Sequence, residues 1–302
     1  MLASIVSAGE KRRILRTRLE SGGLTVLPGA FNVLSAQAIA RAGAAGVYIS
    51  GHMIAADLGL PDIGLTTLTE VSQRAHQIAR MVDVPAIVDA DTGFGEPANT
   101  ARSIQLLEDA GIAGCHIEDQ INPKRCGHSE GVEVVDVDIA VRRIRGAVLG
   151  RRDAGFVIIA RTDARAASGM DAAIERARVF VDAGADVVFP EALRSPDEYR
   201  RFRDAVDAPM MINLNEFGGR APFTQQQVRD LGYQLAVYPM TLMRLAMGAV
   251  ADGVRDLLAE GSQHDLMDRM QTRDALYELL DYDGHAAFDE TILHGRSTGG
   301  SR

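Results

Sequence analysis

The chain has 302 residues, of which 46% are hydrophobic and 24% are charged, as in an ordinary globular protein. Lys and Arg number 32 against 41 Asp and Glu, so the formal net charge of −9 argues against nucleic-acid binding. No apolar run approaches about 18 residues and no signal-peptide pattern is found, so neither membrane insertion nor secretion is expected. The two cysteines, Cys115 and Cys126, are too few for a disulfide framework and fit a reducing cytoplasm.

Short apolar runs alternate with amphipathic stretches along the chain. A basic helix is expected up to about Arg18. Glycines that end helices are followed by β-rich apolar runs, a layout typical of strands buried on both faces. The eight predicted strand segments are 25–28, 43–50, 86–91, 111–118, 156–161, 184–191, 209–213 and 232–239. The helical stretches between them are 34–41, 68–80, 100–110, 138–149, 172–182, 197–206 and 225–231.

Eight strands that alternate with helices predict a parallel sheet closed into a (β/α)8 barrel of the TIM type. An open doubly wound sheet is the alternative, but no G-x-G-x-x-G follows the first strand. Further helices at 241–260 and 263–282 are surplus to a barrel. We therefore expect one barrel domain over residues 1–293 with a helical extension at about 241–290, and a disordered tail at 294–302.

Polar side chains gather where the predicted strands end, which is where barrel enzymes place their active sites. Period-two alternation puts Asp89 and Asp91 on one face, and likewise His116 and Glu118. Carboxylates that converge repel one another unless a cation neutralises them, and oxygen ligands suit Mg²⁺ or Mn²⁺. Alternatively, these acids cap the following helices or pair with Arg161. The further polar residues at strand ends are Ser50, Asp163, Glu191, Asn213 and Asn215.

The segment 120–131 is too polar for a core and is rich in turn residues, so we expect a mobile loop over the barrel mouth. Within it, Cys126 lies close to Arg125 and His128, and nearby cations make a thiol a better acid–base group. Cys115 has the opposite parity to Glu118 and should face the helices as a structural cysteine.

The loop Lys124-Arg125-Cys126-Gly127-His128 resembles the signature loop of the isocitrate lyase/phosphoenolpyruvate mutase superfamily, in its lyase branch. The segment 270–278 is similar to the C-terminal region of the 2-methylisocitrate lyases in particular. The resemblance extends from about Arg12 to Phe288. The other segments that match family motifs in order and spacing are 58–62, 88–95, 116–120, 160–163, 189–192 and 215–218.

This resemblance implies a Mg²⁺-dependent carbon–carbon lyase, with Mn²⁺ as a possible substitute. The implied reaction is the retro-aldol cleavage of 2-methylisocitrate to pyruvate and succinate, a step of propionate catabolism in the methylcitrate cycle. It implies a small 2-hydroxy di- or tricarboxylate as the ligand, with no nucleic acid or membrane partner. It also implies a cytoplasmic homotetramer, a dimer of dimers that exchange a C-terminal helix.

The resemblance further assigns roles to single residues. Asp89 is the expected direct metal ligand, and the residues expected to hold metal-bound waters are Asp91, Glu118 and Asp62. Cys126 is the expected proton donor, within a closing lid that also contains Lys124, Arg125, Gly127 and His128. The expected substrate-binding groups are Ser50, the backbone N–H groups of Gly51 and His52, and Arg161, Glu191, Asn213, Asn215 and Pro239. The base remains open between Tyr48, Glu118 and a metal-bound hydroxide.

Three departures from the family pattern concern the substrate pocket: His52 and Met53 replace small residues, Asn215 replaces a threonine, and Val237 replaces a larger aliphatic residue. Changes of this size shift selectivity by about 1–3 kcal/mol, so a related acid such as 2,3-dimethylmalate is the alternative substrate. A phosphonate mutase or oxaloacetate hydrolase needs no thiol acid, so Cys126 argues against both. A non-catalytic barrel would be expected to have lost the acids or the cysteine.

Overall fold

The computed structural model describes residues 3–125, 127, 131–217 and 223–294. Among these, no helix is both long and apolar enough to cross a membrane. The chain divides into two compact units. One comprises residues 5–243, and the other comprises residues 244–302 together with residues 1–4.

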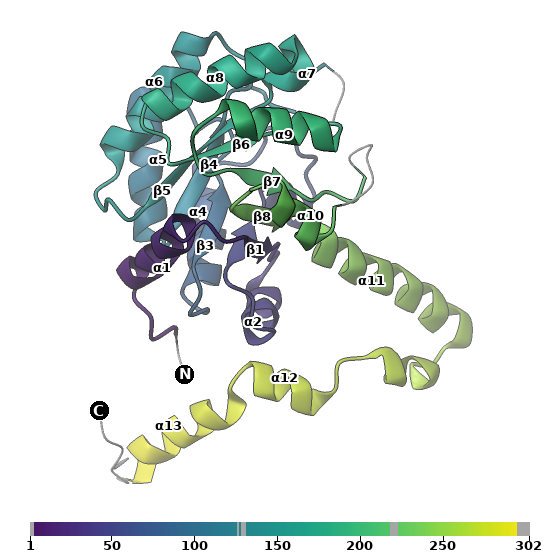
Figure 1. Cartoon of the computed structure of the whole chain (residues 1–302). Coiled ribbons are helices and arrows are strands. Elements are labelled where there is room, and N and C mark those ends of the chain that lie inside the picture. The colour runs from purple at the N-terminus through teal and green to yellow at the C-terminus, as the bar shows by residue number, and fades with distance from the viewer. Residues whose placement is uncertain (1–2, 126, 128–130, 218–222, 295–302) are drawn as a thin grey trace. The chain divides into compact units, whose positions relative to one another are not determined.

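Eight parallel strands form the barrel of the larger unit (Figure 1). The five-stranded sheet has the order β2 (Val47–Ile49), β3 (Ala86–Asp89), β4 (Gly114–Glu118), β5 (Val157–Thr162) and β6 (Val187–Pro190). The three-stranded sheet has the order β1 (Thr25–Pro28), β8 (Leu235–Tyr238) and β7 (Met211–Asn213). Parallel bridges from Gly29 to Tyr48 and from Val188 to Met210 join the two sheets. The strands therefore close into a ring in chain order, and the predicted TIM-type barrel is confirmed.

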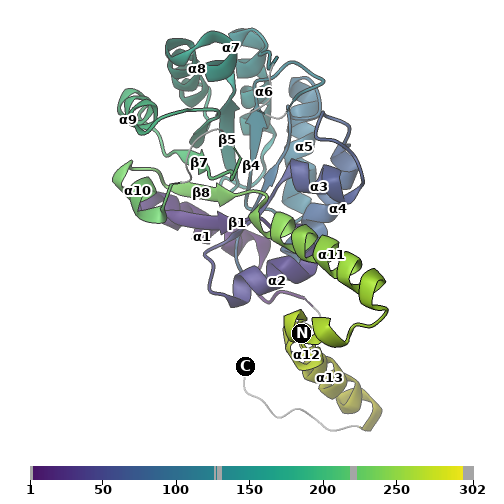
Figure 2. The same ribbon diagram turned by 90° about the vertical axis from the view of Figure 1, so that its right-hand side faces the viewer.

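Helices follow the strands and cover the outside of the sheet (Figure 2). They are α2 (Val33–Arg41), α3 (Gly51–Asp57), α4 (Leu68–Ala79), α5 (Pro97–Asp109), α6 (Val137–Gly150), α7 (Ala164–Ser168), α8 (Met170–Asp182), α9 (Pro196–Ala205) and α10 (Gln225–Asp230). The sequence prediction lacked the short helices α3 and α7. It also extended β3 two residues too far, because Asp91 has a φ of 45°, which no strand residue adopts.

The smaller unit is helical. It contains most of α11 (Thr241–Glu260), followed by a 3₁₀ helix (His264–Arg269), α12 (Arg273–Leu279) and α13 (Tyr282–His294). The single helix predicted at 263–282 is wrong, because Thr272 caps a new helix and Asp281 leaves the helical region with a φ of 54°. The unit exposes large apolar side chains, among them Leu245, Leu258 and Phe288. The expected domain boundaries stay a prediction.

Helix α1 (Ala8–Glu20) contributes Leu15 and Leu19 to the cluster of apolar side chains inside the barrel, with Leu27, Ile87 and Val157 among their companions. Its cations bond to the main chain of distant segments. Arg12 donates to the carbonyls of Ile112 and Glu108, at 3.0 and 2.7 Å, and Arg16 donates to that of Phe156 at 2.9 Å and to Asp186 at 2.7 Å. The predicted basic helix therefore packs on the barrel.

A buried polar network joins the carboxyl ends of β4 and β5. Asp119 accepts hydrogen bonds from the Thr162 hydroxyl and the Asp163 N–H, both at 2.8 Å, and lies 3.4 Å from Arg176. Burial, reinforced by the charge of Asp163, raises the pKa of Asp119 to about 6. The network fixes the two strand ends that carry Glu118 and Arg161.

Replacing Gly146 by alanine should destabilise the barrel by roughly 1–3 kcal/mol, because overpacking moves backbone. Helices α5 and α6 pack closely at this glycine, and a Cβ there would lie 2.6 Å from the Pro97 carbonyl oxygen and 2.9 Å from its Cα. Urea denaturation checks the loss. Gly9→Ala is the control, since nothing lies within 4 Å of a Cβ at that helical position. Equal stability of the two variants would contradict the close packing.

Replacing Asp119 by asparagine should flatten the dependence of stability on pH. The folded-state pKa of about 6 exceeds the ordinary 3.8, so the folded chain holds a proton that the unfolded chain has released. This contribution to stability is complete below about pH 4 and lost above about pH 6, on the order of 3 kcal/mol. Denaturation of both proteins in EDTA at pH 4.5 and 6.5 measures the difference, and identical slopes would refute the raised pKa.

Candidate metal and active site

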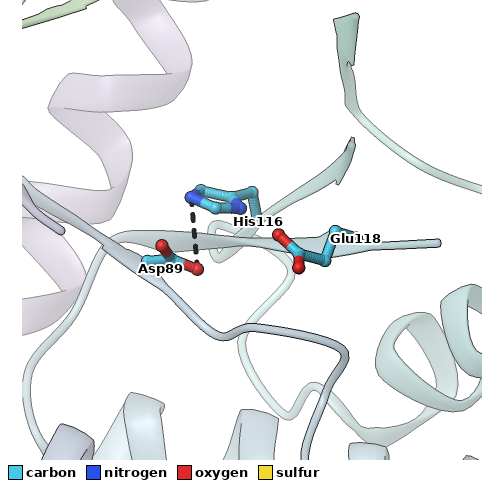
Figure 3. Close-up of side chains that lie close together, drawn as sticks. All are labelled: Asp89, His116 and Glu118. Atoms are coloured by element: carbon cyan, nitrogen blue, oxygen red, sulfur yellow. Dashed lines mark ion pairs between the residues drawn. The ribbon is translucent and has the colours of Figure 1, made fainter. Parts of the chain in front are cut away.

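Three titratable side chains meet at the carboxyl ends of β3 and β4: Asp89, His116 and Glu118 (Figure 3). One ligand atom of each lies within 4.8 Å of those of the other two, and all three side chains are buried. Glu118 Oε1 has no hydrogen-bond partner among the described residues. A buried carboxylate oxygen without a donor is costly unless a cation completes it, so the residues fit a divalent metal ion.

Lys124 brings positive charge to the same place. Its ammonium lies 2.8 Å from Asp91 Oδ1 and pairs with Asp62. Burial favours the neutral amine, but the carboxylates of Glu118, Asp91 and Asp89 overcome it and raise the pKa of Lys124. Of the four acids expected to serve the metal, Asp89 and Glu118 therefore lie in the cluster with His116, whereas Asp62 and Asp91 pair with the Lys124 ammonium.

Asp89, at the end of β3, and Asp91, two residues later, differ in their affinity for a proton. Burial would raise the pKa of Asp89, but the charges of His116, Lys124 and Arg161 together lower it to about 2. Burial lowers the pKa of His116 itself, so its imidazole is neutral at pH 7. Burial raises the pKa of Asp91 to about 6, against the opposing pull of Lys124. Asp89 is therefore the stronger acid of the two and is ionised at neutral pH.

Arg161 is the second cation of the barrel mouth. Its guanidinium makes two hydrogen bonds to Asp163, at 3.0 and 2.9 Å, and lies 3.4 Å from Glu118 and 3.7 Å from Glu191. It also lies over the ring of Phe189, 5.4 Å from the centroid. A planar guanidinium held by a bidentate carboxylate is fixed in orientation. Arg161 therefore pairs with acids, as the sequence suggested, and it does so beside the cluster of Asp89, His116 and Glu118.

Tyr48 and His116 form a buried pair, with 2.7 Å between the phenol oxygen and Nε2 of the imidazole. His116 Nε2 also lies 3.5 Å from Asp89 Oδ1, the contact drawn in Figure 3. Burial, followed by the charge of Asp89, raises the pKa of the Tyr48 phenol well above its ordinary value. Tyr48 is therefore protonated at neutral pH.

Helix α3 begins where β2 ends, and its first residues approach the acids. Ser50 is the buried N-cap residue, and its side chain makes no capping hydrogen bond. The Gly51 N–H donates to Asp89 Oδ2 at 3.2 Å, and a Cβ on Gly51 would lie 2.9 Å from the same oxygen. His52 Nδ1 lies 3.8 Å from Asp62. The expected carboxylate cradle therefore lies beside the acidic cluster.

The remaining expected substrate groups come from β6, β7 and β8. Asn213 donates to Glu191 Oε2 at 3.1 Å, next to Arg161. Asn215 instead accepts from the Phe217 N–H at 3.0 Å, in the segment after β7. Pro239 is buried directly after β8. The structure therefore joins Asn213 to the site through Glu191, whereas Asn215 bonds locally.

Two described residues of the loop after β4, Lys124 and Gly127, reach the site. Arg125, between them, is exposed. Lys124 contacts the acids, and Gly127 is buried where a Cβ would lie 2.5 Å from Arg161 and from Asp163. Cys126 and His128, expected as proton donor and lid cation, lie outside the described residues.

Three functional candidates had no assigned role in the sequence prediction. His116 was noted for its parity with Glu118 but was given no role at the metal. Asp163 holds Arg161, and its position two residues later in the chain was the available signal. Gln120 bonds to the backbone of Arg125, which no sequence pattern indicates.

Comparisons with known proteins give the family. The model of the phosphoenolpyruvate phosphomutase family matches residues 15–258. A probable 2-methylisocitrate lyase 2 of Corynebacterium glutamicum is 54% identical over 293 residues, which cover 97% of this chain and 95% of that one. The 2-methylisocitrate lyase of Escherichia coli is 45% identical over 257 residues, covering 84% and 86%.

A crystal structure of 2,3-dimethylmalate lyase, described as a member of the PEP mutase/isocitrate lyase superfamily, superposes with a TM-score of 0.89 at 32% identity and covers 99% of both chains. The superfamily expected from the sequence is confirmed by all three comparisons. The chain belongs to the phosphoenolpyruvate phosphomutase family, and the relatives compared with it by sequence are carbon–carbon lyases.

Proposed function

We propose that this chain is a carbon–carbon lyase that cleaves 2-methylisocitrate to pyruvate and succinate with the help of a divalent metal ion. The observation that carries the proposal is 54% identity, over nearly the whole chain, to a probable 2-methylisocitrate lyase. The buried triad of Asp89, His116 and Glu118 beside Arg161 supports it, because the reaction needs a cation and a fixed positive charge in one cavity.

We assign the metal to Asp89 as its direct ligand, with Glu118, Asp91 and Asp62 as the residues that would hold its waters. The oxygen-rich donor set favours Mg²⁺, with Mn²⁺ as an acceptable substitute, and His116 Nε2 is engaged by Tyr48. A bound divalent cation supplies a Lewis acid that lowers the cost of ionising the substrate hydroxyl. Lys124 neutralises Asp62 and Asp91 from the other side.

The cations that surround the mouth suit the charge that develops during cleavage. As the carbon–carbon bond breaks, the pair of electrons stays with the succinate fragment. Arg161 is fixed by Asp163 and stabilises this charge, with Glu191 and Asn213 orienting the substrate. Ser50 and the N–H groups of Gly51 and His52 bind the carboxylate of the pyruvate half. The loop residues Lys124, Arg125 and Gly127, with Asn215 and Pro239, complete the substrate site. His128, which lies outside the described residues, is assigned to it on the sequence pattern alone.

Proton transfers occur at both ends of the breaking bond. Tyr48 enters the reaction protonated, because burial raises the pKa of its phenol, and so donates a hydrogen bond. The base stays open between Tyr48 and Glu118, because burial raises the pKa of the Glu118 carboxyl as well as that of the phenol. Cys126, which lies outside the described residues, is assigned as the acid that protonates carbon on the sequence pattern alone.

The test is an assay of the purified chain with Mg²⁺ and 2-methylisocitrate, in which pyruvate is followed through a coupled reductase. Isocitrate and 2,3-dimethylmalate run alongside. Rapid release of pyruvate that EDTA abolishes supports the proposal. Turnover of 2,3-dimethylmalate alone would favour a second candidate function, cleavage of that acid. The superposition with a 2,3-dimethylmalate lyase supports this alternative. No turnover of any of the three would refute the lyase activity.

Replacing Cys126 by serine should lower kcat roughly 10²–10⁴-fold, the usual contribution of a positioned general acid. Cys115→Ala is the control, because Cys115 is buried and packs in the cluster between sheet and helices. The control should keep kcat within about twofold. A Cys126→Ser protein with normal kcat would remove the thiol from the mechanism.

We further propose that two copies exchange their C-terminal helices and that two such dimers form a tetramer. An apolar groove of about 730 Å³ lies on the outer wall of the barrel, between β1, α2 and α10. A complete barrel would place the helix after β8 there. In the smaller unit, helix α11 exposes Leu245, Val250 and Val254, which supports a partner copy as the occupant.

Replacing Ala38 by glutamate should break the assembly, because Ala38 is exposed on α2 and lines the groove. Light scattering on the eluting protein should show loss of the tetramer. Ala98→Glu, at the exposed start of α5, is the matched control and should leave the mass unchanged. A groove variant that stays tetrameric would refute the exchange. The role in propionate catabolism and the cytoplasmic location stay predictions of the sequence.

A further inference from the structure

The side chain of Gln120 is buried and bonds to a single residue of the following loop. Its Oε1 accepts from the Arg125 N–H at 2.8 Å, and its Nε2 donates to the Arg125 carbonyl oxygen at 2.9 Å. A carboxamide that satisfies both backbone groups of one residue fixes that residue in position and direction, as a neighbouring strand would.

Gln120 itself is firmly anchored. It forms an antiparallel bridge with Val134, and Arg143 donates to its carbonyl oxygen at 3.3 Å. On either side, the Ile121 N–H donates to the Glu133 carbonyl at 3.0 Å and the Val135 N–H donates to the Asp119 carbonyl at 2.9 Å. The chain therefore leaves and re-enters the barrel at one short ladder, and Gln120 reaches from this ladder to Arg125.

The neighbours of Arg125 contact the site directly. Lys124 reaches Asp62 and Asp91, and Gly127 packs against Arg161 and Asp163. The Lys124 contact is an ion pair whose strength depends on the total charge among the acids. The Gly127 contact is only a close approach. The two hydrogen bonds from Gln120 are neutral and directional, so they hold the segment whatever the charge of the cluster.

We propose that Gln120 is the positioning residue that holds the backbone of Arg125, and with it Lys124, at the mouth of the barrel. It does so through Arg125 and touches neither substrate nor metal. The inference deepens the proposed lyase function for its effect on turnover, but the structural part is independent of the reaction catalysed.

Trypsin supplies a test that does not depend on activity, because it cleaves after Lys124 and Arg125 only when this segment leaves its place. Gln120→Met keeps the length of the side chain and removes both hydrogen bonds. In the metal-free full chain, cleavage after these two residues should become about tenfold faster, as mapped by mass spectrometry. Gln120→Glu keeps the acceptor and loses the donor, so its rate should lie between.

Gln234→Met is the matched control. Gln234 also uses its carboxamide on the backbone, accepting from the Met210 N–H at 2.7 Å and donating to the Gly232 carbonyl at 3.0 Å, at the opposite end of the barrel. It should leave cleavage after Lys124 and Arg125 at the wild-type rate. Both Gln120 variants cleaving as slowly as wild type would overturn the proposal, as would equal acceleration in the control.

Turnover of 2-methylisocitrate gives the second reading. Gln120→Met should lower kcat at least about tenfold and change KM less than threefold, with partial recovery in Gln120→Glu, because a displaced segment affects the reacting complex more than initial binding. An unchanged kcat in both variants would overturn the effect on turnover. Should the wild-type chain not cleave this substrate, the proposed function fails, and the proteolysis result still decides the role of Gln120.

Discussion

The mouth of the barrel is governed by an excess of carboxyl groups over cations. Six carboxylates gather there, against two described cations: Asp62, Asp89, Asp91, Glu118, Asp163 and Glu191, with Lys124 and Arg161. Carboxylates out of water are stable only if each has a cation or a donor. The raised pKa of Asp91 and the two hydrogen bonds between Arg161 and Asp163 both follow from this constraint.

The same constraint bears on the proposed substrate. A tricarboxylate is itself an anion, and it would be repelled by this mouth without added positive charge. A divalent cation and the cationic loop after β4 both supply that charge. The proposed reaction therefore needs the metal, the loop and the substrate at the mouth together. The two hydrogen bonds between Gln120 and Arg125 are neutral, so their strength does not depend on the charge there.

Much of the fold could be predicted, because strand and helix periods are local properties of the sequence. The eight strands and the barrel follow from the alternation of apolar runs. The prediction failed at β3, where period-two alternation was extended to Asp91, although this residue turns with a positive φ and pairs with Lys124. It failed again at 263–282, where Thr272 and Asp281 interrupt a continuous amphipathic pattern.

The site was predictable in its location and less so in its pairings. Motif residues at strand ends indicated the acids, since parallel strands bring their carboxyl ends to one side of a sheet. Which acid meets which cation depends on contacts between distant segments, such as Lys124 with Asp62 or Tyr48 with His116. No local pattern encodes these distances, and for Gln120 the partner is a backbone, which has no sequence signature.

The attachment of α1 has a consequence for the order of folding. This helix is synthesised before the rest of the barrel, yet its seat is built from residues made much later: Arg12 bonds at Ile112, and Arg16 bonds at Phe156 and Asp186. The helix therefore cannot complete these contacts until five of the eight strands, β1 to β5, have been synthesised. Docking of α1 on the barrel is accordingly a late step in folding that depends on contacts between residues distant in sequence.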